Sequence, residues 1–170
     1  MSKSIENLTT SILKDLNVTK APIDIVNIAI KKGVTIKPYD LGDGVSGVLV
    51  VDKDKSVIGY NPSEHVVRQR FTIAHELGHF IMHRSQAELF VDKEKVLFRN
   101  HASSTGEIKR EREANNFAAS ILMPEYLIYK EINDRHIDSI DETAIKELAK
   151  VFNVSQQAMT IRLTKLNLFW

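Results

Sequence analysis

His75-Glu76-Leu77-Gly78-His79 is the stretch of this sequence that says most about its fold and its chemistry. Two histidines four residues apart lie on one face of an α-helix, about 6 Å apart along its axis. Both imidazoles can then bind one zinc ion at Zn–N distances of about 2.0–2.1 Å. Glu76 follows the first histidine directly and points to the side, where it can accept a proton from a water molecule at the metal. The pattern predicts a metal-dependent hydrolase with this motif on a helix.

The residues around the motif predict a buried helix from Ser63, as N-cap, to about Arg84. A helix that is apolar on most sides is typically buried. The apolar residues here are Phe71, Ile73, Ala74, Leu77, Phe80, Ile81 and Met82. Gly78 in mid-helix costs about 1 kcal/mol relative to alanine. We therefore expect another chain segment, a strand or a substrate, to approach closely at Gly78.

A catalytic zinc site needs a third protein ligand, and this chain has no cysteine to supply one. His83 continues the histidine spacing, but it lies about 12 Å along the helix from His75, too far from a metal between His75 and His79. The remaining histidines, His65, His101 and His136, stand outside any ligand spacing. A helix predicted at about 107–123 offers Glu111 and Glu113, and both are candidates.

Several motifs together resemble the ImmA/IrrE family of metallopeptidases. They are Arg68–Ala74 before the histidine motif, Glu111–Ala119 with its Glu-x-Glu-Ala-Asn-x-Phe-Ala-Ala pattern, and Leu122-Met123-Pro124. The resemblance covers the chain from the Pro22 region to Pro124, and more loosely to its end. It implies a cytoplasmic zinc endopeptidase that cleaves a helix-turn-helix repressor of a phage, mobile element or stress regulon.

The resemblance also assigns roles to residues. It makes His75, His79 and Glu111 the ligands of one zinc ion per chain, with Glu76 as general base and then general acid. Helical geometry agrees, because Glu111 lies about 50° and Glu113 about 110° from the centre of the apolar face. We expect Glu113 to face solvent or to pair with a base such as Lys109 or Arg110. Asn115, one turn after Glu111, can hydrogen-bond to a ligand imidazole without touching the metal.

The predicted fold class is α+β: a zincin-like metallopeptidase core with a small, mostly antiparallel sheet, plus a helical C-terminal appendage. The predicted helices near the N-terminus are residues 4–17 and a helix that Pro22 opens and Gly33 follows as C-cap. Strands are expected at 34–36, 48–51 and 56–60, the last two as a hairpin, with a further candidate strand at 95–98. The loop 103–106 precedes the 107–123 helix. We place the core domain at 1–132 and the helical segment at 133–170.

The C-terminal segment has a helix-turn-helix pattern, with Asp141 and Ser155 as N-caps. In a DNA-binding unit, the base contacts would come from Gln156, Gln157, Thr160 and Arg162. Residues 138–170 carry four acidic and four basic side chains, so they have no surplus charge for phosphate contacts. We therefore expect no direct DNA binding, and interpret the segment as packed on the core or as a substrate-docking surface.

Composition agrees with one ordinary globular protein. The chain has 170 residues and a formal net charge of +1, which excludes a general electrostatic footprint for nucleic acid or membrane. No export signal and no stretch of about 20 apolar residues is evident, so we expect a cytoplasmic protein without a membrane partner.

Two points stay open at this level. The group that stabilises the oxyanion is not evident, with Tyr60, Tyr126, Tyr129 and His101 as candidates. The alternative function is a non-proteolytic regulator that binds a repressor or DNA, with structural zinc.

Overall fold

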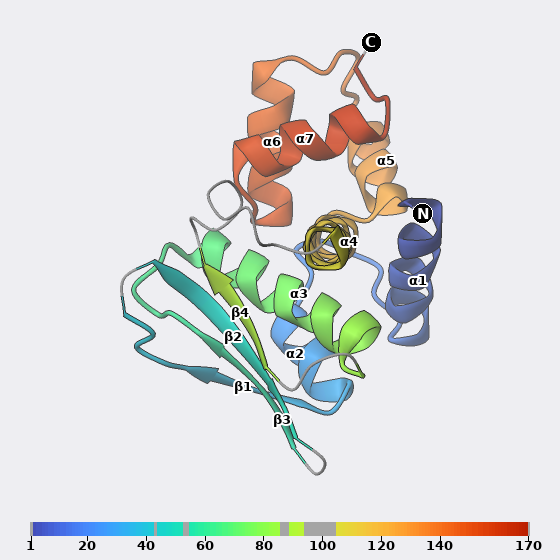
Figure 1. The fold of residues 1–170 in the computed structure, drawn as a ribbon. Coiled ribbons are helices and arrows are strands. Elements are labelled where there is room, and N and C mark those ends of the chain that lie inside the picture. The colour runs from blue at the N-terminus through green and yellow to red at the C-terminus, as the bar shows by residue number, and fades with distance from the viewer. Residues whose placement is uncertain (1, 43, 53–54, 86–88, 94–104, 170) are drawn as a thin grey trace. The chain divides into compact units, whose positions relative to one another are not determined.

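The computed structural model describes residues 2–42, 44–52, 55–85, 89–93 and 105–169. In these ranges the chain forms seven helices and four strands (Figure 1). The helices are α1 (Ser2–Asp15), α2 (Ile25–Lys31), α3 (Val66–His83), α4 (Thr105–Leu122), α5 (Glu125–Asp134), α6 (Glu142–Phe152) and α7 (Gln156–Lys165). The strands are β1 (Val34–Pro38), β2 (Val45–Val51), β3 (Ser56–Tyr60) and β4 (Leu89–Lys93). The predicted α+β class is confirmed.

The chain divides into two compact units. The sheet unit comprises residues 24–118, and the helical unit comprises residues 1–23 together with 119–170. The helical unit therefore joins the two ends of the chain, with α1 beside the C-terminal helices. The boundary predicted between residues 132 and 133 stays a prediction.

The sheet has the strand order β1-β3-β2-β4. β2 pairs antiparallel with β3 and with β4, whereas β1 pairs parallel with β3. The predicted hairpin of β2 and β3 is confirmed, and the sheet is mostly antiparallel as expected. The strand β4 was not predicted, and the candidate strand at 95–98 lies outside the described residues.

α2 and α3 cover one face of the sheet (Figure 1). α3 begins later than predicted, because His65 and not Ser63 is its N-cap. The N–H and the hydroxyl of Ser63 both donate to Oδ1 of Asn61, at 3.0 and 2.7 Å. These bonds hold Ser63 in a turn, while Nδ1 of His65 accepts from the N–H of Val67 at 3.3 Å.

Helix α2 also begins later than predicted. Pro22 does not open it; Asp24 is the N-cap, and its carboxylate accepts from the N–H of Asn27 at 3.0 Å. A capping side chain satisfies a backbone donor that proline cannot satisfy, so the cap decides where the helix starts. Gly33 follows the end of the helix with φ +85°, as predicted for a C-terminal glycine.

Helix α4 begins at Thr105, two residues before the predicted start, so Thr105 and Gly106 are helical and not loop. The rest of that predicted loop, Ser103 and Ser104, lies outside the described residues. Pro124 terminates α4 and stands as the N-cap residue of α5.

Capping in the helical unit follows the prediction. The side chain of Asp141 accepts from the N–H of Ala144 at the start of α6, and Ser155 accepts from the N–H of Ala158 at the start of α7. Between them, Asn153 ends α6 in the left-handed conformation, with φ 52°. Arg162, one of the four residues proposed for base contacts, is only 4% exposed and hydrogen-bonds within the unit. It is therefore not available to read DNA.

None of the helices formed by the described residues is long and apolar enough to cross a membrane.

Candidate metal centre

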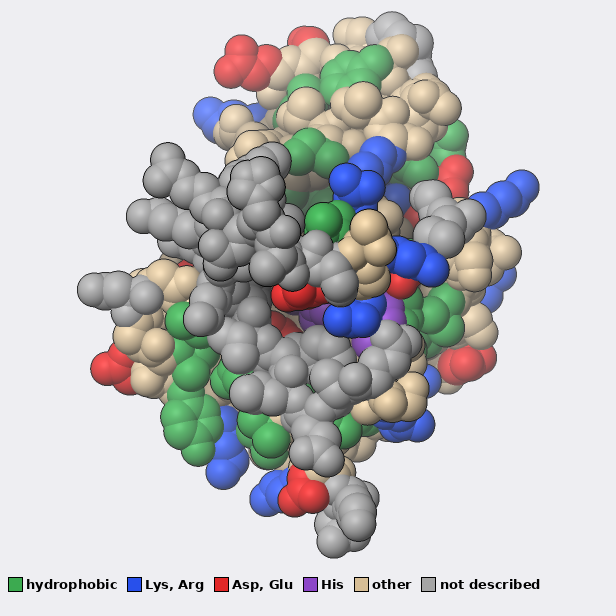
Figure 2. All heavy atoms as spheres, in the orientation of Figure 1, with side chains coloured by type: hydrophobic (Ala, Val, Ile, Leu, Met, Phe, Trp, Pro, Cys, Tyr) green, Lys and Arg blue, Asp and Glu red, His purple; other side chains and the backbone are tan. Residues whose placement is uncertain are grey.

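The motif His75-Glu76-Leu77-Gly78-His79 lies in the middle of α3, within the sheet unit. His75, Glu76 and His79 are 3%, 0% and 1% exposed. Polar groups at this depth need partners, because an unpaired buried polar group costs about 1–3 kcal/mol. For the two histidines such partners come from α4, which supplies Glu111 and Asn115. Figure 2 shows histidine side chains at one place on the visible face, beside acidic and basic side chains.

Three candidate ligand atoms converge on one point. Nε2 of His75 and Nε2 of His79 are 3.1 Å apart. The Glu111 carboxylate lies 3.2 Å from Nε2 of His75 and 3.1 Å from Nε2 of His79. In a tetrahedral zinc site with bonds of about 2.0–2.1 Å, neighbouring ligand atoms are about 3.3 Å apart. His75, His79 and Glu111 therefore form a candidate metal site whose spacing and donor set fit zinc.

The electrostatics favour the metal-binding forms of these groups. Burial tends to raise the pKa of Glu111, but its hydrogen-bond contacts with the rings of His75 and His79 outweigh burial and hold that pKa well below its usual range. Burial lowers the pKa of His79, and the contact with Glu111 opposes this only in part. An ionised carboxylate and a neutral imidazole are the states that bind metal.

The side chain of Asn115 hydrogen-bonds to the imidazole of His75 at Nδ1, the ring nitrogen that does not face Glu111. Its Oδ1 lies 3.0 Å from Nδ1 of His75, so the ring donates its Nδ1 hydrogen to the amide oxygen. A ring that donates from Nδ1 presents the Nε2 lone pair to a metal. The structure thus brings Asn115 to the place where the sequence predicted it.

The expectation for Glu113 is wrong. Its carboxylate neither faces solvent nor pairs with Lys109 or Arg110; Oε2 lies 3.0 Å from Nε2 of His83. The angular argument correctly separated Glu113 from Glu111, but it placed Glu113 away from the apolar face and so expected no partner for it on α3. His83, one turn after His79, is buried there and supplies a hydrogen-bond donor. The signal was in the sequence, because His83 continues the i, i+4 series on the same face of the helix as His79.

Glu76 is completely buried where β2 packs on α3. A Cβ at Gly47 of β2 would overlap Cγ2 of Thr72 and lie 3.5 Å from Cγ of Glu76. Glycine at this strand position therefore lets the sheet approach the helix closely beside the general-base candidate. Gly78 serves the same purpose on the other side, although its neighbour is a helix side chain and not a strand. A Cβ there would lie 3.1 Å from Cδ1 of Phe117 in α4.

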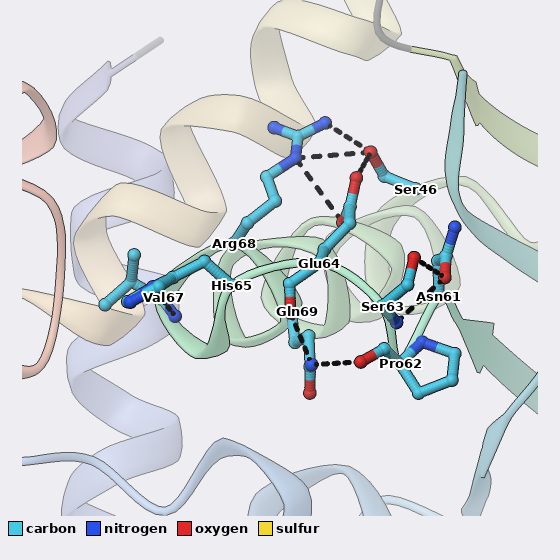
Figure 3. A network of polar contacts seen from close by, with 9 residues as sticks. All are labelled: Ser46, Asn61, Pro62, Ser63, Glu64, His65, Val67, Arg68 and Gln69. Atoms are coloured by element: carbon cyan, nitrogen blue, oxygen red, sulfur yellow. Dashed lines mark hydrogen bonds and ion pairs between the residues drawn. The ribbon is translucent and has the colours of Figure 1, made fainter. Parts of the chain in front are cut away.

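The first turn of α3 is tied to the start of β2 (Figure 3). The hydroxyl of Ser46, which is fully buried, donates to Oε1 of Glu64 at 2.7 Å and accepts from Nη2 of Arg68 at 2.8 Å. The side-chain amide of Gln69 donates back to the carbonyls of Pro62 and Glu64, at 3.0 and 2.7 Å. This network fixes where α3 starts, and with it the phase of the histidine face. Sequence reasoning missed it because Ser46 and Arg68 are 22 residues apart.

Three other candidate residues have roles or positions outside the group of ligands. His65 caps α3, and His136 is exposed after α5 with φ 54°. The hydroxyl of Tyr126, whose pKa burial raises, donates to the carbonyl of Val18 at 2.9 Å. His101 falls outside the described residues. Tyr60, at the end of β3, and Tyr129, in α5, stay candidates for stabilising the oxyanion.

Comparison with known proteins agrees with this geometry. The model of the Peptidase M78 family, described as the IrrE N-terminal-like domain, matches residues 29–164. The chain belongs to this family. The ImmA/IrrE resemblance and the zincin-like core are thereby confirmed, and membership supports metallopeptidase activity.

Two relatives share 27% sequence identity with the chain. One is the uncharacterized immunity region protein 2 of Bacillus phage phi105, matched over 128 residues, which are 72% of this chain and 75% of that protein. The other is metallopeptidase ImmA of Bacillus subtilis strain 168, matched over 169 residues, which are 99% of this chain and 89% of that protein.

A solved structure of a Mycobacterium tuberculosis transcriptional regulator has a TM-score of 0.66 at 16% identity. The match covers 95% of this chain but 46% of that one, and it shows a shared fold alone.

Proposed function

We propose that this protein is a zinc-dependent endopeptidase that cleaves a helix-turn-helix transcriptional repressor in the cytoplasm and so relieves repression. The observation that carries the peptidase assignment is the convergence of His75, His79 and Glu111 on one point, with the fully buried Glu76 directly after His75 in the same helix. One zinc ion per chain fits this donor set, which contains no sulfur.

The roles of the residues follow from their positions. When bound, zinc supplies Lewis acidity towards the scissile carbonyl and the attacking water. Glu76 accepts the proton of that water and later delivers it to the departing amine nitrogen. Asn115, through its bond to Nδ1 of His75, keeps that ring turned towards the metal. The depth of Glu76 in the core keeps its carboxylate in one place through both proton transfers.

The repressor as substrate rests on the family resemblance and on what relatives are called. One relative is named as a protein of a phage immunity region, and another as the metallopeptidase ImmA. The non-proteolytic alternative, a regulator that binds DNA, is weakened by the burial of Arg162.

The experiment that tests the proposal uses a helix-turn-helix repressor encoded beside this gene. We expect wild-type protein with zinc to cut it at one site, visible on a gel and located by N-terminal sequencing. The Glu76→Gln variant should bind the repressor without cutting it. We expect little activity on casein, because a protein of this size has few subsites for arbitrary peptides. Binding without cleavage by the wild type would instead favour the non-proteolytic regulator.

A further inference from the structure

His83 contacts the candidate metal centre and Glu113 contacts His83, although neither is a candidate ligand. Nδ1 of His83 lies 3.3 Å from Nδ1 of His79, and Nε2 of His83 lies 3.0 Å from Oε2 of Glu113. The His83 ring is therefore held between a candidate ligand in its own helix and a carboxylate in α4. Its side chain is 4% exposed and that of Glu113 is 20% exposed. Neither belongs to the group of described residues that can hold a metal.

Hydrogen-bond chemistry gives this line a direction. A carboxylate only accepts, so Nε2 of His83 donates to Glu113. In the neutral His83 ring, Nδ1 is then an acceptor. When Nε2 of His79 binds a metal, the ring carries its hydrogen on Nδ1, and that hydrogen can be donated to Nδ1 of His83 at 3.3 Å. In this tautomer the Nε2 lone pair of His79 faces the position between Glu111 and His75.

The other candidate ligand has the same arrangement with a shorter connection. Nδ1 of His75 donates directly to Asn115 of α4 at 3.0 Å. His79 lies one turn further along α3 and is connected to the same helix through His83. α4 thus supplies Glu111 towards the metal position, Asn115 behind the first imidazole and Glu113 behind the second. Glu111, Glu113 and Asn115 are spaced by two residues, so they cannot all lie on one face of α4. Glu113 contacts His83 and not a candidate ligand, and His83 in turn contacts His79.

We infer that His83 and Glu113 are positioning residues, which hold His79 in its metal-binding tautomer and orientation and so strengthen zinc binding without touching the metal. The inference rests on the proposed zinc centre. Outer partners of ligand histidines contribute about 10- to 100-fold to metal affinity in other zinc proteins. A contact that only tied α3 to α4 would contribute to folding stability but not to zinc affinity.

The test is zinc affinity of the purified full chain, measured by competition with a chromophoric chelator. We expect His83→Ala and Glu113→Ala to weaken zinc binding about 10- to 100-fold. Glu113→Gln retains a side-chain oxygen that accepts from His83, so its affinity should lie nearer to wild type. Because Glu113 acts through His83, the double variant should bind no worse than His83→Ala alone.

A matched control breaks a buried charge pair of the helical unit. Glu6→Gln should lower thermal stability and leave zinc affinity unchanged. If His83→Ala does not fold, the pair Glu113→Ala and Glu113→Gln carries the same comparison. The Nδ1 hydrogen of the His79 ring in the zinc-loaded protein gives a second readout by NMR. It should exchange slowly with solvent in wild type and faster in Glu113→Ala, which leaves His83 without its carboxylate partner.

The outcomes separate the inference from the proposed function. Zinc affinities of both alanine variants within about twofold of wild type would overturn the positioning role, provided that His79→Ala loses zinc. If His79→Ala itself retains zinc, the centre is elsewhere, and the inference falls together with it.

Discussion

Each of the two units holds a group of ionisable side chains that is buried at least in part, and the two groups differ in what their polar atoms face. In the helical unit, the guanidinium of Arg162 donates to both carboxylate oxygens of Glu6, at 2.9 and 2.5 Å. It also donates to the carbonyl of Met123 at 2.9 Å, and the hydroxyl of Ser120 donates to the same carboxylate at 2.8 Å. Donors there meet acceptors, and the group is complete as it stands.

In the sheet unit, three groups that can each be a metal ligand converge instead. Nδ1 of His75 and of His79 faces Asn115 and His83, so Nε2 of both rings faces the carboxylate of Glu111. This donor set fits a cation bound among the three side chains. A matched pair of opposite charges thus stabilises the fold, whereas a carboxylate that converges with two imidazoles indicates a cation site.

The largest expected effect concerns Glu76, which follows the candidate ligand His75 in α3. Glu76→Gln should lower the rate of repressor cleavage by about 10²–10⁴-fold, because an amide cannot accept the proton of water. Zinc content, measured by atomic absorption, should stay at the wild-type value. Loss of zinc together with activity would mean that Glu76 is itself a zinc ligand, in addition to the three candidate ligands.

The next effect separates two glutamates on one helix. Glu111→Gln should lower zinc affinity by more than about 100-fold, beyond the effect of an outer partner, because a neutral amide is a poor ligand. Glu113→Gln is the matched control, with the same change of charge two residues away, and should stay within about tenfold of wild type. Chelator competition measures the zinc affinity of both variants. A larger loss of affinity in Glu113→Gln than in Glu111→Gln would place the metal at His83 and Glu113.

Breaking the complete pair should affect stability alone. Glu6→Gln leaves Arg162 buried without its counter-charge, at a cost of about 3–5 kcal/mol in the free energy of unfolding. The double variant Glu6→Leu/Arg162→Met removes both charges and should recover much of that loss. Urea unfolding measures both variants. A change in zinc affinity in either would contradict the separation of the two groups.

The smallest effect is the pH dependence of zinc binding near neutrality. Zinc binds the neutral imidazole, so affinity is full above the pKa of the free ligand and falls as pH drops through it. Because burial lowers the pKa of His79, proton competition there should begin below the ordinary histidine value of 6.5. Zinc titrations between about pH 8 and 5 should be flat down to this value. A decline that already starts above about pH 7 would contradict the neutral, buried imidazole.

Local signals in the sequence predicted much of this protein correctly. The i, i+4 histidines were placed on one helix because helical periodicity depends only on neighbouring residues. The same holds for the caps Asp141 and Ser155, whose partners lie three residues away. The hairpin of β2 and β3 has a short turn, and it too was found. The Glu111 assignment followed from the family resemblance, with the helical phase in agreement.

Other features depended on contacts between segments that are distant in sequence. The parallel pairing of β1 with β3 and the union of α1 with the C-terminal helices are of this kind. So are the Ser46 network at the start of α3 and the pair of His83 with Glu113. A side chain's partner across 30 residues is set by how two helices pack, which no local pattern encodes.

Local sequence patterns were thus enough to show which residue types can hold a metal and on which helix face two of them lie. The partners of these side chains came from the packing of α4 on α3. This packing lets Glu111, Asn115 and Glu113 meet His75, His79 and His83 at hydrogen-bond distance. The physical reason is that a ligand's chemistry is local to its side chain, whereas its orientation is imposed by a neighbour that only folding brings near.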